Sequence, residues 1–359
     1  MNDLGSFIET VCSDSRLRVD EDFGGGFVRL KRSEAEKRQA AQDIRSTEDV
    51  VIECLRNARD AGARRIYVAV SRDEAKRSLV VVDDGCGVPE NMNDRIFEPR
   101  VTSKLDSAHM DKWGMHGRGM ALYSIRENAE SAAVACSRLG RGTSIVIDTN
   151  LETLGEKTDQ STFPSFEVRD GVHVMRGPRN ILRTCAEFAL EHRKDCEVFC
   201  GSFTEIVAAM YEYGMATLTP VARALGDSAG DASLPQALAF AARPEDLAER
   251  SEQLGMVIST RSARRIMDGS IEPALSLVER LKLVSFPEVR GADRSSRANV
   301  RSHSKGLKLD AADVDRLSRD VSRAFKEIAE RYFLVSDVKP EIRVSGDSIR
   351  ITIPVEKML

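Results

Sequence analysis

The segment that decides the fold is residues 46–89, which read STEDVVIECLRNARDAGARRIYVAVSRDEAKRSLVVVDDGCGVP. Ser46 and Asp49 are spaced as a capping box with Asp in place of Glu, and Gly62 is placed to end the helix that they begin. Residues 66–70 and 79–82 are rich in β-branched side chains and are joined by a short polar turn, which predicts two strands. The segment therefore predicts a helix followed by two strands.

The next hundred residues extend this pattern. Residues 84–119 contain repeated Gly and Pro and are too long for an ordinary connection, so we expect them to be functional. A helix near 120–130 and strands at 133–136 and 144–147 follow. Together these elements predict an α+β fold, an α/β sandwich in which helices cover one face of a few strands.

Length and composition bound the class of protein. The chain has 359 residues, which predicts two or three domains. Its content of 42% hydrophobic and 31% charged residues is typical of a soluble globular protein. Lys and Arg number 53 against 57 Asp and Glu, so a net charge of −4 gives no global basic field for nucleic acid or anionic lipid. No apolar run is long enough to cross a bilayer, and the start does not resemble a signal peptide. Seven cysteines without C-x-x-C spacing favour reduced thiols in a cytoplasm.

The first candidate site lies on the predicted helix. Glu53, Asn57 and Asp60 occupy positions i, i+4 and i+7 and form one polar stripe opposite an apolar arc. The arc consists of Val51, Cys54, Leu55, Ala58 and Ala61. Two carboxylates and an amide can bind a divalent cation and orient a water for attack, although a solvated polar face is the alternative.

Two glycine-rich segments add to this site. Asp83 ends a predicted strand, where its carboxylate can accept a hydrogen bond from an exocyclic amine, and Gly85 and Gly87 let a flat ligand lie against bare backbone. A plain turn is the alternative for the Asp-Gly pair. Residues 114–122 form a second glycine-rich segment that leads into a helix, and backbone amides at such a helix start can cradle phosphates.

These segments together resemble the motifs of the GHKL ATPases, the superfamily of gyrase B, the ninety-kilodalton heat-shock chaperone, histidine kinases and MutL mismatch-repair proteins. The resemblance covers about residues 46–147 and consists of four ordered motifs: Glu53-x-x-x-Asn57-x-x-Asp60-Ala61-Gly62-Ala63, Asp83-x-Gly85-x-Gly87, Thr102-Ser103-Lys104 and Gly114-x-x-Gly117-x-Gly119. Residues 60–63, 84–87 and 102–104 are most similar to MutL. Residues 96–99 and 119–125 are more similar to histidine kinases.

The resemblance implies ATP and Mg²⁺ as cofactors and a role for each matching residue. Glu53 matches the general base, Asn57 the Mg²⁺ ligand, and Asp83 the carboxylate that reads the adenine amine, with Thr143 as its support. Lys104 is expected to reach the γ-phosphate and to act in catalysis. The other expected nucleotide-binding residues are Asp60, Gly85, Gly87, Gly114, His116, Gly117, Arg118, Gly119 and Met120. Arg118 departs from the small or acidic residues common at its position, which leaves the path of that loop open.

Three functions fit these residues. The resemblance favours an ATP-hydrolysing conformational switch that forms an ATP-dependent homodimer. A histidine kinase-like protein kinase is the first alternative, but no histidine precedes His109, and we interpret His192 and His303 as surface residues. A non-hydrolysing ATP-binding scaffold is the second alternative, which the presence of Glu53, Asn57 and Asp83 disfavours.

The remaining sequence predicts further domains but does not identify the molecule on which the protein acts. The expected divisions are an N-terminal arm (1–45) with a flexible hinge at Gly24–Gly26, the ATP-binding domain (46–150), a second α/β and helical domain (151–289), a basic linker (290–308) and a C-terminal helix with a hairpin (309–359). Linker arginines could bind nucleic acid or a protein client, and a solvated linker is the alternative. Residues 251–269 weakly resemble a helix-turn-helix, although their spacing departs from the usual one and favours a plain helical hairpin. No D-Q-H-A-x-x-E endonuclease motif occurs.

Overall fold

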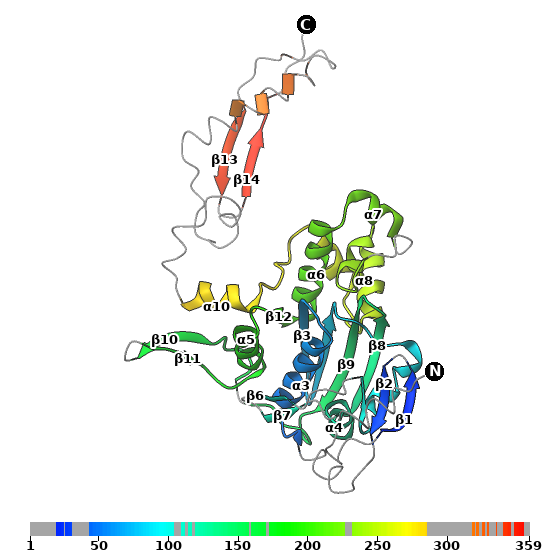
Figure 1. Cartoon of the computed structure of the whole chain (residues 1–359). Coiled ribbons are helices and arrows are strands. Elements are labelled where there is room, and N and C mark those ends of the chain that lie inside the picture. The colour runs from blue at the N-terminus through cyan, green and yellow to red at the C-terminus, as the bar shows by residue number, and fades with distance from the viewer. Residues whose placement is uncertain are drawn as a thin grey trace. The chain divides into compact units, whose positions relative to one another are not determined.

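The computed structural model describes residues 19–24, 26–30, 43–103, 109–111, 114–116, 119–157, 159–169, 172–226, 232–285 and parts of 318–354. The chain forms two compact units, Met1–Ser285 and Phe286–Leu359. Figure 1 shows the elements of both, and each unit is described by itself below.

A five-stranded mixed sheet is the centre of the first unit. Its order is β12 (Glu197–Ser202), β3 (Arg65–Asp73), β4 (Lys76–Asp83), β9 (Gly142–Asn150) and β8 (Ser131–Arg138). β12 pairs parallel with β3, while the other neighbours are antiparallel. The segment beyond residue 150, which the sequence sets apart as a second domain, therefore contributes an edge strand to the sheet of residues 46–150.

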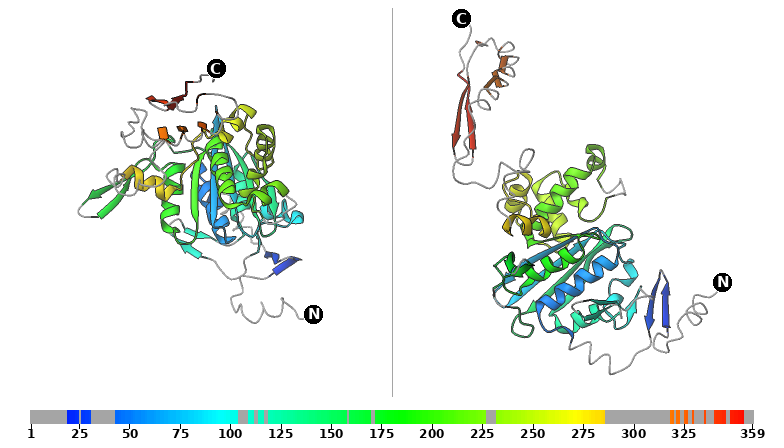
Figure 2. Two further views of the ribbon diagram at one scale, coloured as in Figure 1. Left: turned by 90° about the horizontal axis from the view of Figure 1, so that it is seen from above. Right: turned by 60° about the vertical axis from the view of Figure 1, so that its left-hand side comes forward.

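Helices cover both faces of this sheet (Figures 1 and 2). One core contains side chains of α3 (Thr47–Asp60), α4 (Ala121–Asn128) and α5 (Ile181–Glu191). The opposite core contains side chains of α6 (Phe203–Thr217), α8 (Pro244–Gln253) and α9 (Thr260–Met267). Alternate residues of β3 enter the two cores, Ile66 and Val68 the first, Tyr67 and Ala69 the second.

The expected α+β sandwich is confirmed for residues 46–150, and the second face of its sheet is covered by helices that follow in the chain. Within residues 46–150 the helices α3 and α4 do share one face. Without further helices, the side chains of Tyr67, Ala69, Val80 and Val82 on the second face would be exposed. Helices after residue 202 bury these side chains. The remaining helices of the unit are α7 (Pro220–Leu225), α10 (Leu277–Ser285) and short 3-10 turns at Glu90–Met92, Arg95–Phe97 and Gln236–Phe240.

Smaller sheets border the core. β1 (Val19–Gly24) and β2 (Phe27–Leu30) form a hairpin that pairs through β2 with β5 (Val101–Thr102). The other pairs are β6 (His109–Asp111) with β7 (Gly114–His116), and β10 (Ser165–Arg169) with β11 (Val172–Arg176). Both pairs are antiparallel.

The glycines of the N-terminal segment make a turn rather than the flexible hinge that the sequence predicts. Gly24 and Gly26 have φ angles of 77° and 86°, and Gly24 pairs with Phe27 across the turn. Val28 and Leu30 are buried, because β2 lies against β5. Residues 19–24 and 26–30 are therefore part of the first unit's own fold.

The sequence predicts the C-terminal end of α3 correctly but not the capping of its N-terminal end. The helix stops before Gly62, whose φ is 76°, as predicted. The capping box is wrong, because Ser46 makes no capping hydrogen bond and Asp49 Oδ2 instead accepts from the backbone N–H of Arg45 at 2.9 Å.

The second unit contains the predicted C-terminal hairpin. β13 (Glu341–Ser345) pairs antiparallel with β14 (Ser348–Thr352), with Ile342 opposite Ile351. Phe325 and Ala329 of the preceding segment are buried. The basic linker and most of the predicted C-terminal helix lie outside the described residues. Among the helices of the described ranges, none is long and apolar enough to cross a membrane.

Candidate functional site

A cleft of about 500 Å³ opens on the α3 side of the central sheet. Its walls come from α3, the ends of β4 and β9, the segment after β4, and the start of α4. Seven of the residues that the sequence assigns to nucleotide binding or catalysis line it: Glu53, Asn57, Asp60, Asp83, Gly87, Gly119 and Thr143. The structure thus brings together residues that are as far as ninety positions apart in the chain.

Asp83 is the buried carboxylate of the cleft. It is the last residue of β4, and its side chain accepts hydrogen bonds from the backbone N–H groups of Gly85, at 2.7 Å, and Thr143. Burial raises the pKa of Asp83 to about 7; the nearby Asp84 charge adds to this rise and the two N–H groups oppose it. The support expected from Thr143 thus includes its backbone, while its hydroxyl lies 3.2 Å from Ser137 Oγ.

Gly87 lines the cleft, and its close contact with the backbone of Arg138 requires a glycine at this position. A Cβ on Gly87 would lie 2.2 Å from the carbonyl oxygen of Arg138, and the φ of Gly87 is 71°. Gly85 does not line the cleft in the described structure. Gly85 packs against Ala61 instead and holds the Asp83 carboxylate with its N–H.

The polar stripe of α3 faces the cleft, so the alternative of a solvated face is wrong. Glu53, Asn57 and Asp60 are all partly buried there. Asn57 Nδ2 is buried and has no hydrogen-bond partner in the described structure. An unpaired amide in a cleft is costly unless a ligand completes it, so Asn57 indicates a polar ligand at this point.

Arg56 is a cleft residue that the sequence analysis missed. Its side chain is 3% exposed, and its Nη1 donates to Glu53 Oε1. It stands at i+3 from Glu53 on the same side of α3, a spacing that could have pointed to this ion pair. The cleft therefore contains a cation beside the carboxylate that the sequence assigns as a general base.

Asp60 is fixed by its neighbour. Arg59 donates to Asp60 Oδ1 from Nε at 3.0 Å and from Nη2 at 2.7 Å, and its Nη1 lies 3.1 Å from Nε2 of His192. His192 packs against Phe188 with its side chain 13% exposed, so the surface position expected for it is wrong. His303 lies outside the described residues. Arg59 and His192 thus connect α3 to α5 directly behind the cleft.

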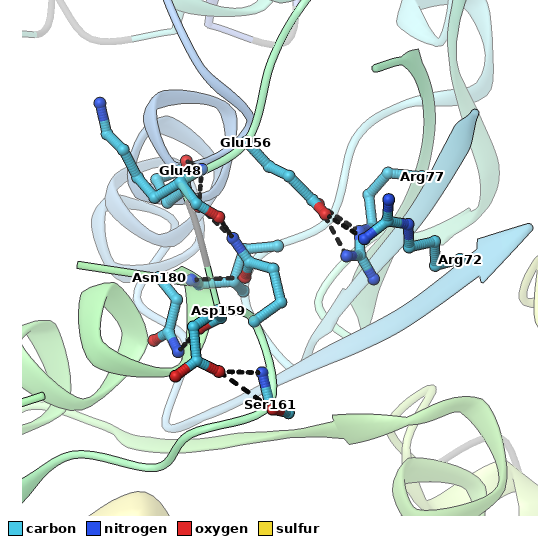
Figure 3. Close-up of polar contacts among 10 residues, drawn as sticks. Glu48, Arg72, Arg77, Glu156, Asp159, Ser161 and Asn180 are labelled. Atoms are coloured by element: carbon cyan, nitrogen blue, oxygen red, sulfur yellow. Dashed lines mark hydrogen bonds and ion pairs between the residues drawn. The ribbon is translucent and has the colours of Figure 1, made fainter. Parts of the chain in front are cut away.

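A connecting segment after β9 holds the N-terminal end of α3 (Figure 3). The buried Glu48 accepts from the backbone N–H of Lys157 at 3.1 Å and from Gln160 Nε2 at 2.6 Å. Glu156 of the same segment binds Arg77 of β4, with Oε2 2.6 Å from Nη2, and Arg72 of β3. Such buried, charge-assisted bonds fix the helix that carries Glu53 relative to the sheet that carries Asp83.

Apolar side chains complete the walls. Those that the sequence analysis did not assign are Phe27, Val81, Val88, Pro89, Ile96, Val101, Leu122, Leu139 and Ile145. Leu139 is 66% exposed, which is unusual for a leucine and leaves an apolar surface at the entrance. Phe27 reaches the cleft through the pairing of β2 with β5, a non-local contact that no local pattern indicates.

The glycine-rich segment before α4 is described only in part. Gly114 and His116 lie in β7, so the first part of the expected loop is a strand. Gly119 lines the cleft, whereas Met120 is the N-cap residue of α4 and does not. Lys104, Gly117 and Arg118 lie outside the described residues.

Similarity to known proteins covers this part of the chain. Residues 42–153 match the family described as histidine kinase-, DNA gyrase B-, and HSP90-like ATPase. The chain is also similar to the DNA mismatch repair protein MutL of Staphylococcus aureus strains Newman, N315 and COL, with 34% identity over 137 residues. Residues 42–153 form an ATPase domain of the GHKL superfamily. The match covers 37% of this chain and spans 20% of the length of the MutL proteins.

The GHKL domain fits a nucleotide with a bound cation. The cleft has the size of a small-molecule site, and both apolar side chains and the polar residues of α3 line it. No group of three or more His, Cys, Asp or Glu in the described ranges forms a metal centre by itself. Mg²⁺ commonly takes one or two protein ligands and completes its shell with phosphate oxygens and waters, so Asn57 suits a cation that enters with its nucleotide.

The raised pKa of Asp83 predicts a pH-dependent stability of the ligand-free domain. The pKa is about 7 in the folded chain and ordinarily 3.8, so between about pH 4 and pH 7 the unfolded chain has lost a proton that the folded chain retains. The free energy of unfolding therefore falls as pH rises through that window. We expect Asp83→Asn to remove this pH dependence. Its free energy of unfolding relative to that of wild type should therefore increase by up to about 3 kcal/mol between pH 5 and pH 8.

Urea unfolding of wild type and Asp83→Asn at pH 5 and pH 8 measures this difference in the free energy of unfolding. If the two proteins keep a constant difference in stability across the range, the carboxylate is not desolvated as the structure indicates.

Proposed function

We propose that this chain binds ATP with Mg²⁺ in the cleft of its GHKL domain and hydrolyses it as a conformational switch. The observation that supports this most is the convergence of Glu53, Asn57 and Asp83 on one cleft, each with the chemistry that a different part of ATP requires. Asp83 offers an acceptor for the adenine amine, and Gly87 lines the same cleft. Asn57 lies three residues, about one turn of α3, before Asp60, at the polar wall where phosphates would lie.

In this proposal the protein supplies position and charge. Asn57 would hold Mg²⁺, which neutralises phosphate charge when it is bound. Glu53 would take a proton from the attacking water, and its place on the rigid, doubly anchored α3 would orient that water. Phosphoryl transfer needs little more from a protein than positioning and electrostatic stabilisation, so these groups suffice. Lys104 remains a proposed contact to the γ-phosphate.

A non-hydrolysing ATP-binding scaffold is the second candidate, and the ion pair of Glu53 with Arg56 favours it. A carboxylate held by a guanidinium is a poor proton acceptor. On the hydrolase proposal, Arg56 leaves Glu53 when ATP binds and contacts the phosphates instead, because both lie on the same wall of the cleft. The two candidates differ in whether ATP is turned over at all.

Phosphate release from ATP tests this choice. We expect turnover by wild type in Mg²⁺ that stops in EDTA, and an ATP KM about tenfold higher for Arg56→Gln, because a charge-assisted bond to phosphate is lost. Arg56→Lys keeps the charge and is the matched control, with a smaller change expected. If all three proteins bind ATP and none of them hydrolyses it, the scaffold is supported and the hydrolase is contradicted.

Self-association and a client are part of the same proposal. We infer that ATP, and not ADP, promotes a homodimer in the cytoplasm, because residues 102–104 could sense the γ-phosphate. Light scattering in the ligand-free, ADP and ATP-analogue states tests this, and one unchanged mass would contradict it. The client is proposed to be a macromolecule, in keeping with the similarity to a DNA mismatch repair protein.

A further inference from the structure

The unit formed by α8, α9 and the turn between them is rigidly attached to the central sheet. The turn spans residues 254–259 and contains Gly255, whose φ is 86°. A Cβ on Gly255 would lie 2.1 Å from Val146 Cγ2, so the turn packs closely against β9. Ser144 Oγ of β9 donates to the carbonyl oxygen of Leu254 at 2.7 Å. The turn is thereby anchored on the face of the sheet opposite the GHKL cleft.

The helix α9 has one buried and one exposed face. Ala263 and Ile266 are 0% and 5% exposed and enter the core, where α9 contacts α6 and α8. Arg261, Arg264 and Arg265 are all exposed and, at i, i+3 and i+4, share the outer face. Ser259 caps the helix by accepting from the N–H of Ser262 at 3.1 Å, so the arginines stand on a helix that is defined at its start.

These arginines differ from several others in the described structure. Arg77, Arg183 and Arg243 are examples of arginines held in ion pairs. Within the described ranges, no hydrogen bond or ion pair joins the guanidinium groups of α9 to a carboxylate. Hydrogen bonds from Ser270 lower the pKa of Asp268, and the charges of Arg265 and Arg264 add to this shift. Asp246 of α8 is bound to Arg243. The outer face of α9 thus presents three exposed arginines with no direct ion pair in the described ranges.

We propose that α8 and α9 form a helix-turn-helix that binds duplex DNA, with α9 in the major groove. An α-helix with its side chains is about 10–12 Å across, which matches a major groove about 12 Å wide that admits one helix. Guanidinium groups are the side chains best suited to both phosphates and guanine edges. This proposal concerns a surface separate from the cleft and does not depend on ATP binding or hydrolysis.

Fluorescence anisotropy with the full chain and a labelled duplex of about 20 base pairs tests it. We expect binding in the absence of ATP that is weakened by added salt. The combined change Arg261→Ala, Arg264→Ala and Arg265→Ala should weaken binding at least about tenfold and reduce the salt slope of log K by about 2 to 3.

A matched control removes the same charge elsewhere. Arg179, Arg193 and Lys194 are exposed and lie near the ends of α5, so the triple change Arg179→Ala, Arg193→Ala and Lys194→Ala should leave DNA affinity within about twofold of wild type. Circular dichroism and urea unfolding establish that both triple variants are folded. Equal loss in the two variants, an unchanged affinity in the α9 variant, or no duplex binding by wild type would each overturn the proposal.

Discussion

Replacing Glu53 by Ala should leave ATP binding nearly intact and reduce turnover about 10²- to 10⁴-fold, the usual contribution of a general base. Glu53 lines the cleft from α3, whose N-terminal end is fixed by Glu48 and whose C-terminal end is fixed by Arg59. Its carboxylate can therefore be removed without a change in the path of the helix. Phosphate release at saturating ATP, together with calorimetric titration of ATP, separates turnover from binding.

Glu127→Ala is the control for this experiment. Glu127 is an exposed carboxylate on α4, outside the cleft, so its loss should change neither quantity. Full ATPase activity in Glu53→Ala would mean that another group activates the water. Transfer of the γ-phosphate to a histidine of the protein would instead support the kinase alternative.

Replacing Asp83 by Asn should weaken ATP binding about 10- to 150-fold, or about 1.5–3 kcal/mol. The N–H of Gly85 already occupies Oδ1 of the aspartate. An asparagine would turn its carbonyl oxygen to that donor and its NH₂ group to the adenine amine, so that two donors face each other. Calorimetric titration of ATP at pH 8, where Asp83 is ionised, measures the loss.

The neighbouring Asp84→Asn provides the comparison. Asp84 does not line the cleft, and its Oδ1 accepts from the backbone N–H groups of Arg64 and Arg65 at 2.7 and 2.9 Å. We expect this variant to lose some stability but to keep its ATP affinity. Asp83→Asn should behave in the opposite way above pH 7, with higher stability and weaker binding. Equal ATP affinity in wild type and Asp83→Asn would remove Asp83 from the site.

Local sequence patterns predicted the elements that carry the GHKL site. The apolar period of α3 placed Glu53, Asn57 and Asp60 on one stripe, and the stripe does face the cleft. Asp83 was placed correctly at a strand end because β-branched runs mark β4 clearly. Such features depend on neighbours along the chain, which a sequence displays directly.

Features that depend on distant parts of the chain were missed. The parallel pairing of β12 with β3 joins residues more than a hundred positions apart, and nothing near Glu197 indicates it. The contact of His192 with Arg59 and the place of Phe27 in the cleft have the same origin. The ion pair of Arg56 with Glu53 is local, but its burial was not predictable without knowledge of which face of α3 is covered.

The central claim is that ATP occupies the cleft between α3 and the ends of β4 and β9. A crystal structure of the full chain with Mg²⁺ and a non-hydrolysable ATP analogue tests it most directly. The account predicts the adenine amine within hydrogen-bond distance of Asp83, the cation bound to Asn57, and Arg56 turned from Glu53 to the phosphates. An analogue bound elsewhere, or a cleft that stays empty at saturating analogue with the Glu53 and Arg56 pair intact, would contradict it.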